Sequence, residues 1–149
     1  MIMSDATTTE IEETTRTAEA DKLRKEEVRR SVLLVEDDPA NREALQEILE
    51  GWGYEVLPMC SAEEAEYAIR RRRPDVALVD VYLPGKSGSK LMSRLREKFP
   101  DLVLIGMSGL GDAAMARSVK GVGADLFIGK PIELDALADA LKASHRSWH

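Results

Sequence analysis

The sequence contains one cysteine, two histidines, no excess of basic residues and no long apolar run. Cys60 cannot form an internal disulfide, which fits a reducing compartment, and we expect it to be a small core residue. His145 and His149 lie in a polar C-terminal tail, where we expect solvated side chains rather than ligands. These absences exclude a disulfide-stabilised scaffold and a histidine-based metal site.

Charge and hydropathy exclude two further classes of protein. The net charge is −6, whereas a nucleic-acid-binding domain needs a basic face. The N-terminus, M-I-M-S-D-A-T-T-T-E, lacks the apolar segment of a signal peptide, and no stretch is long enough to span a bilayer. We therefore expect a soluble, cytoplasmic protein that binds neither nucleic acid nor membrane.

The 149 residues divide into a polar N-terminal extension, 1–30, and one domain, 31–149. After the first three positions, the only sizeable apolar residues of the extension are Ile11, Leu23 and Val28, which do not follow helix or heptad spacing. The extension is expected to be helical or disordered. A docking arm for a partner is an alternative.

From Ser31 onward, apolar strand-like runs alternate with amphipathic helical segments. Helix signals include a capping box of Ser61 and Glu64, and an apolar ridge of Leu134, Leu137 and Leu141. Strands are predicted at 32–35, 54–57, 76–79, 102–105 and 126–128, and helices at 40–50, 62–72, 87–98, 112–120 and 132–144. This alternation predicts a doubly wound (βα)5, flavodoxin-like α/β fold, with a five-stranded parallel sheet in the order 2-1-3-4-5.

The stretch around Asp80 organises the chain. Residues 76–79 are wholly apolar, as in a central strand covered on both faces, and Asp80 follows them directly before a Pro-Gly turn. Taken alone, this aspartate is equally well explained as a turn or cap residue. Ligands of open parallel sheets, however, bind at the carboxyl ends of the strands.

Other strand ends carry side chains suited to the same chemistry. In the predicted order, Glu36 and Asp37, Asp80, Ser108 and Lys130 converge on one edge of the sheet. Three carboxylates so close repel one another unless they share a cation, and Mg²⁺ is the expected ion where phosphate is also a ligand. A carboxylate such as Asp80 then accepts a phosphoryl group, Lys130 supplies positive charge and Ser108 a hydroxyl donor.

Four motifs, in this order, resemble the receiver domain of two-component response regulators. They are V-L-L-V-E-D-D-P, V-A-L-V-D-V-Y-L-P-G-K-S-G, I-G-M-S-G and F-I-G-K-P, and the resemblance covers residues 31–143. It implies that Asp80 is the phosphoacceptor and that Lys130 contacts the phosphoryl group. It also implies a Mg²⁺ site formed by Glu36, Asp37, Asp80 and the backbone carbonyl of Tyr82, with Glu36 acting through water.

The resemblance further implies a switch made of Ser108 and Phe127, and a cis peptide bond between Lys130 and Pro131. Phe127 stands where the family often has tyrosine, so the switch is expected to be less strongly coupled. Tyr82 and Leu110 are positioned to shield an acyl phosphate from water. We therefore expect the phosphorylated form to hydrolyse slowly for a receiver.

The resemblance implies a single-domain response regulator that is not an enzyme, apart from Mg²⁺-dependent self-phosphorylation and autodephosphorylation. Its partners would be a histidine kinase or histidine phosphotransfer protein and an unknown downstream protein. The downstream contact would use the fourth helix, fifth strand and fifth helix, and the chain would be a monomer or weak dimer. Alternatives are the detached receiver of a hybrid histidine kinase, a pseudo-receiver, and a small aspartyl-phosphate phosphohydrolase. The last lacks its expected general acid, because Tyr82 occupies that position.

Overall fold

A computed structural model describes residues 29–83, 87–109, 117 and 121–146. The elements are β1 (Ser31–Val35), α2 (Pro39–Gly51), β2 (Glu55–Met59), α3 (Ala62–Ile69), β3 (Val76–Asp80), α4 (Gly88–Lys98), β4 (Val103–Ser108), β5 (Leu126–Gly129) and α6 (Leu134–Arg146). The extension up to residue 28 and nearly all of the helix predicted at 112–120 lie outside the described residues. No described helix combines the length and the apolar character needed to cross a membrane.

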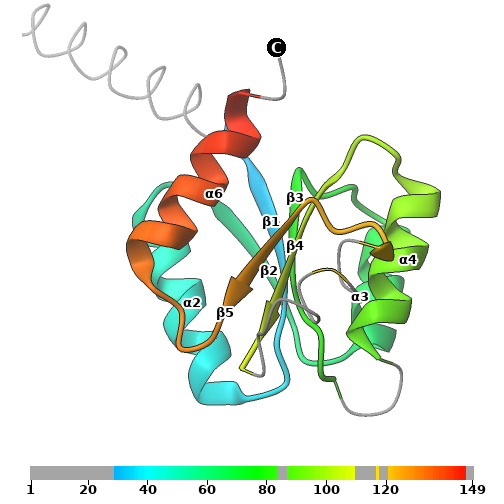
Figure 1. Ribbon diagram of the computed structural model, residues 1–149, viewed down its shortest axis with the longest axis horizontal. Helices are drawn as coiled ribbons and strands as arrows, with labels where there is room; N and C mark the ends of the chain where they lie inside the picture. The colour runs from blue at the N-terminus through cyan, green and yellow to red at the C-terminus, as the bar shows by residue number, and fades with distance from the viewer. Residues whose placement is uncertain (1–28, 84–86, 110–116, 118–120, 147–149) are drawn as a thin grey trace, which may run out of the picture.

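The five strands form one parallel sheet in the order β2-β1-β3-β4-β5, which confirms the predicted topology. Helices α2 and α6 cover one face of the sheet, and α3 and α4 cover the other (Figure 1). β3 lies in the middle, between β1 and β4, and every one of its residues is buried. The expected central strand, covered on both faces, is therefore present.

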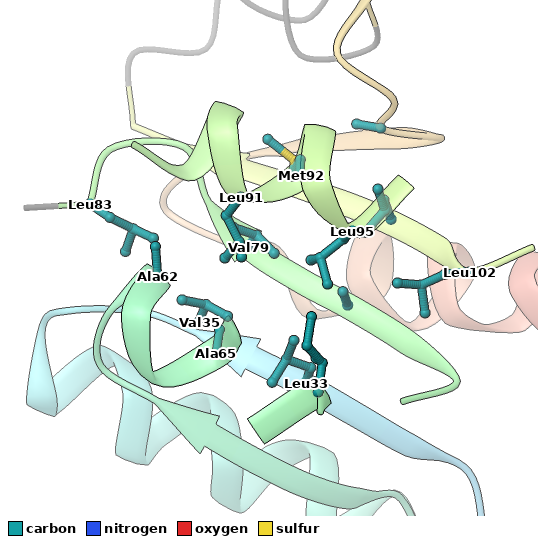
Figure 2. Packing of buried hydrophobic residues seen from close by; sticks show 14 of the residues in the cluster. Leu33, Val35, Ala62, Ala65, Val79, Leu83, Leu91, Met92, Leu95 and Leu102 are labelled. Carbon is teal, nitrogen blue, oxygen red and sulfur yellow. The ribbon is translucent and has the colours of Figure 1, made fainter. Parts of the chain in front are cut away.

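Alternation along the strands divides the core into two clusters. Ala77 and Val79 of β3 face α3 and α4, together with Leu91 and Leu95 (Figure 2). Val76 and Leu78 face α2 and α6 instead and pack with residues such as Leu49 and Leu137. Because both faces of β3 are apolar and covered, its carboxyl end is held in a fixed position.

The capping of α3 differs in part from the predicted box. Ser61 Oγ accepts a hydrogen bond from the Glu64 N–H at 3.1 Å, as expected. The Glu64 carboxylate, however, accepts from the Cys60 N–H at 3.3 Å and from the Cys60 thiol at 2.6 Å. Cys60 is thus a half-exposed loop residue, and the prediction of a core position is wrong. Its hydrogen bond to Glu64 is the largest cause of a raised thiol pKa.

The last helix, α6, buries two of the three leucines in its predicted apolar ridge. Leu137 and Leu141 are buried, but Leu134 is 47% exposed. The helix begins at Leu134, two residues later than expected, so this leucine lies in its first turn. The sequence also predicts Ala44 and Leu45 on one apolar face of α2; Leu45 is buried, but Ala44 is exposed. Both exposed residues line hollows on this side of the molecule.

Candidate phosphorylation site

The three predicted carboxylates do converge. Glu36 and Asp37 follow β1, and Asp80 ends β3, which is the neighbouring strand. Each offers a carboxylate oxygen, and these oxygens all lie within 4.8 Å of one another. Glu36 and Asp80 are buried, at 1% and 5% exposure, whereas Asp37 is exposed. The cluster therefore opens to solvent on the side of Asp37.

Lys130 joins this cluster from the end of β5. Its Nζ donates to Glu36 Oε2 at 2.5 Å and to Asp80 Oδ2 at 2.7 Å. The Lys130–Pro131 peptide bond is cis, as expected. With Lys130 protonated, three carboxylates and one ammonium leave an excess of two negative charges in the site.

Burial and these contacts shift two pKa values. The pKa of Glu36 is raised, chiefly because burial disfavours its charged form, and repulsion from Asp80 adds to the effect against the opposing Lys130 contact. The pKa of Lys130 is also raised: burial alone would lower it, but the hydrogen bonds to Asp80 and Glu36 outweigh burial. The ammonium is therefore retained as long as its two acceptors remain.

The chemistry of this donor set suits a hard divalent cation. All the acidic groups offer oxygen atoms, and one Mg²⁺ ion would balance the two remaining negative charges. Tyr82 lies beside the site, where its N–H donates to Asp80 Oδ1 at 2.9 Å. Its side chain is 48% exposed. Metal binding by its carbonyl remains a prediction.

Ser108 ends β4, one position beyond the residue paired with Asp80, and is fully buried. Its carbonyl accepts from the Lys130 N–H at 2.8 Å, so the predicted hydroxyl and the lysine share one backbone connection. Phe127 lies on β5, half-buried against the cluster that includes α3 and α4. Leu110, the second predicted shielding residue, lies outside the described residues.

Two residues next to the site were not singled out from the sequence. The guanidinium of Arg42 donates through Nη1 to the carbonyl of Glu36 at 2.9 Å and to that of Asp37 at 3.4 Å. Gly88 packs so closely that a Cβ would lie 2.0 Å from the carbonyl oxygen of Asp80. Gly88 belongs to one of the motifs quoted above, whereas only the fold shows where Arg42 points.

Comparison with known proteins identifies the family. The model of the response regulator receiver domain matches residues 32–142. A cyclic di-GMP phosphodiesterase of Thermotoga maritima is 38% identical over 116 residues, which are 77% of this chain and 30% of that protein. Sporulation initiation phosphotransferase F of Bacillus subtilis is 28% identical over 74% of this chain and 90% of its own length.

Solved structures agree. A CheY-like response regulator receiver domain protein of Methanospirillum hungatei JF-1 superposes with a TM-score of 0.74 at 28% identity, covering 80% of this chain and 96% of that one. This chain spans less than a third of the phosphodiesterase, so the likeness concerns one domain of that protein. The chain belongs to the response regulator receiver domain family.

Proposed function

We propose that Asp80 accepts a phosphoryl group from a histidine kinase or a histidine phosphotransfer protein. The observation that carries this proposal is the contact of Lys130 Nζ with Asp80 Oδ2 at 2.7 Å, inside a cluster of three carboxylates. A cation already held against the nucleophile is suited to the oxygens of an incoming phosphoryl group. Residues 31–149 would form a cytoplasmic, single-domain response regulator, with 1–30 as its polar extension.

In the proposed reaction, a carboxylate oxygen of Asp80 attacks the phosphorus of a phosphohistidine. The new O–P bond forms as the P–N bond breaks, and the imidazole leaves with the bonding electron pair and later takes a proton from water. Lys130 then exchanges its contact with Asp80 for one with a phosphoryl oxygen. The Tyr82 N–H, bound to Asp80 Oδ1, holds the carboxylate plane during the transfer.

Glu36, Asp37, Asp80 and the Tyr82 carbonyl would hold the Mg²⁺ ion, with Glu36 acting through water. When bound, the ion supplies positive charge that lowers the repulsion between the carboxylates and the phosphoryl oxygens. The buried state and raised pKa of Glu36 fit a position one layer behind the metal. The exposed Asp37 fits a direct ligand on the open side of the site.

Phosphorylation would act on the end of the sheet that carries Ser108 and Lys130. A phosphoryl group offers new charged acceptors to the Ser108 hydroxyl and the Lys130 ammonium. Because the Lys130 N–H donates a hydrogen bond of 2.8 Å to the Ser108 carbonyl, these two residues would move together. Phe127 would then pack inward, and the face formed by the helix predicted at 112–120, β5 and α6 would contact a downstream protein. The phosphoryl group need only bias two existing conformations.

The donor would dock beside the site. A hollow of about 330 Å³ is lined by Glu36 and Lys130 of the site together with apolar residues that include Ala44, Ile48 and Leu134. An apolar surface leading directly to the nucleophile's lysine suits a protein that must present a phosphohistidine there. The chain would act as a phosphoacceptor with Mg²⁺-dependent self-phosphorylation and autodephosphorylation, and would turn over no separate substrate.

The test is incubation with acetyl phosphate and Mg²⁺, followed by intact mass measurement. We expect the mass of one phosphoryl group on the wild type and none on Asp80→Ala. Asp38→Ala is the matched control, because Asp38 lies in the same region but outside the carboxylate cluster, and it should be labelled normally. Equal labelling of wild type and Asp80→Ala, or none on either, contradicts the proposal.

A further inference from the structure

A second surface of the molecule adjoins the proposed donor hollow and shares only Leu134 with it. A hollow of about 380 Å³ lies between the end of α2 and α6, and it is lined by Trp52, Tyr54, Leu134, Asp135, Ala138 and Lys142. We refer to these six residues as the α2–α6 surface. Trp52 is 41% exposed and Leu134 is 47% exposed, so two of the four large apolar side chains exposed among the described residues line this one hollow. Their joint exposure indicates a binding surface.

The charges of this surface have a symmetric spacing. Asp135 and Lys142 are both exposed and lie seven residues apart on α6, which is about 10.5 Å along two turns of the same face. Within the part of the chain that the structure describes, neither side chain makes an ion pair. Ala138 lies almost midway between them and has a side chain small enough for two helices to approach closely.

We propose that the α2–α6 surface binds a second copy of this chain. A two-fold axis crossing α6 beside Ala138 places two α6 helices antiparallel. Asp135 of each copy then faces Lys142 of the other, so that two ion pairs form. Leu134 and Trp52 of each copy pack at the two ends of this contact, where the hollow receives the side chains of the other copy.

The charge pattern favours a second copy over a different partner. A surface for an unrelated acidic or basic partner would carry charges of one sign, whereas here one acid and one base flank a small residue symmetrically. Such a pattern is complementary to itself under a two-fold rotation. Asp139 is the acidic residue nearest the proposed axis. It lines a different hollow, on the flank of α6 that faces β5, and so does not oppose the contact.

The proposed association is weak, because one helix and one tryptophan bury less surface than a stable dimer needs. The net charge of −6 opposes it at low salt. At physiological salt the screening length is about 8 Å, so the adjacent Asp135–Lys142 pairs outweigh distant repulsion. Association would not require phosphorylation of Asp80, since neither Lys130 nor a residue of the carboxylate cluster takes part.

Sedimentation velocity of the full chain, from micromolar to millimolar concentration, tests the proposal. We expect a weight-average mass that rises with concentration in the wild type. Asp135→Lys and Lys142→Asp should each weaken association about tenfold, because each replaces two attractive pairs with two repulsive ones. The double variant Asp135→Lys, Lys142→Asp should restore association. Lys90→Asp, on α4, is the control for the charge change of Lys142→Asp and should leave association unchanged at physiological salt.

A second measurement locates the axis. In a Cys60→Ser background, Ala138→Cys should be joined to a second copy by a short bismaleimide, whereas Ser93→Cys on α4 should not. Thermal unfolding of every variant checks that the fold is retained. A wild type that is monomeric at all concentrations overturns the proposal. So does a double variant that associates no better than either single variant.

Fluorescence quenching of Trp52 distinguishes a second copy from another occupant of the α2–α6 surface. In a Trp148→Phe background, Trp52 should be quenched by acrylamide at low concentration and become shielded as the concentration rises. A Trp52 already shielded in a strictly monomeric protein would assign the surface to the chain's own residues 1–28. That result also overturns the proposal.

Discussion

Replacement of Asp37 by asparagine should stabilise the metal-free protein while removing its response to Mg²⁺. Asp37 faces Glu36 and Asp80, and the carboxylate oxygens of the three lie within 4.8 Å. Lys130 binds Glu36 and Asp80 but makes no bond with Asp37 among the described residues. Asp37 therefore experiences the repulsion of two acids, of which one is offset by the lysine.

The size of this repulsion follows from the distance. Two unit charges 4.8 Å apart repel by about 0.9 kcal/mol at the dielectric constant of water, which is appropriate because Asp37 is exposed. With one net negative neighbour, Asp37→Asn should raise the free energy of unfolding by about 1 kcal/mol in EDTA. Mg²⁺ at ten times its dissociation constant should then stabilise the wild type by about 1.4 kcal/mol. The variant, which lacks one ligand, should gain much less.

The assay is urea denaturation of both proteins in EDTA and in Mg²⁺. The variant should be the more stable protein in EDTA, and Mg²⁺ should cancel or reverse the order. Asp38→Asn is the matched control, because it removes the same charge from the same loop outside the cluster. It should change stability by no more than about 0.5 kcal/mol under either condition. Equal stabilisation of Asp37→Asn and wild type by Mg²⁺ would refute the proposed role of Asp37.

Three further outcomes are expected. The raised pKa of Lys130 contributes stability that is complete below its ordinary value of 10.5 and is lost as the pH rises through the raised value. In metal-free urea denaturation, the free energy of unfolding of wild type should therefore fall at alkaline pH, and Lys130→Met should lack this fall. The variant Tyr82→Asn, Leu110→Glu should lose its acyl phosphate several-fold faster than wild type, measured as decay of phosphoprotein; an unchanged rate would remove the shielding hypothesis. Gly88→Ala should destabilise the protein by at least about 2 kcal/mol in urea titrations, because the new Cβ would meet the backbone at the end of β3. Gly51→Ala is the control: its new Cβ would meet no atom within 4 Å, so this variant should be neutral or stabilised by up to about 1 kcal/mol.

Much of the architecture could be predicted from local sequence patterns. The apolar run at Val76–Val79 defined a central strand because only a strand covered on both faces is apolar at successive positions. Convergence of Glu36, Asp80 and Lys130 followed from the strand order alone. These predictions rely on apolar runs and on the alternation of strands and helices, both of which can be identified in the sequence.

The remaining features depend on tertiary geometry. Leu134 fits the apolar period of α6 yet is exposed in the first turn of the helix. Glu64 was assigned to cap Ser61, but its carboxylate reaches the preceding residue, Cys60. Arg42 reads as an ordinary helix cation, and its bond to the Glu36 carbonyl depends on the path of the loop before α2. Periodicity contains no information about where a long side chain ends.

The burial of β3 limits which parts of the protein could respond to the proposed phosphorylation. Asp80 is fixed by neighbours on both sides of its strand and by the close approach of Gly88. Its backbone has little freedom to shift, so the response to an added group would fall to the strand ends that carry Ser108 and Lys130. Receivers that share the same reactive groups would then differ in output through the residues packed around those two strand ends.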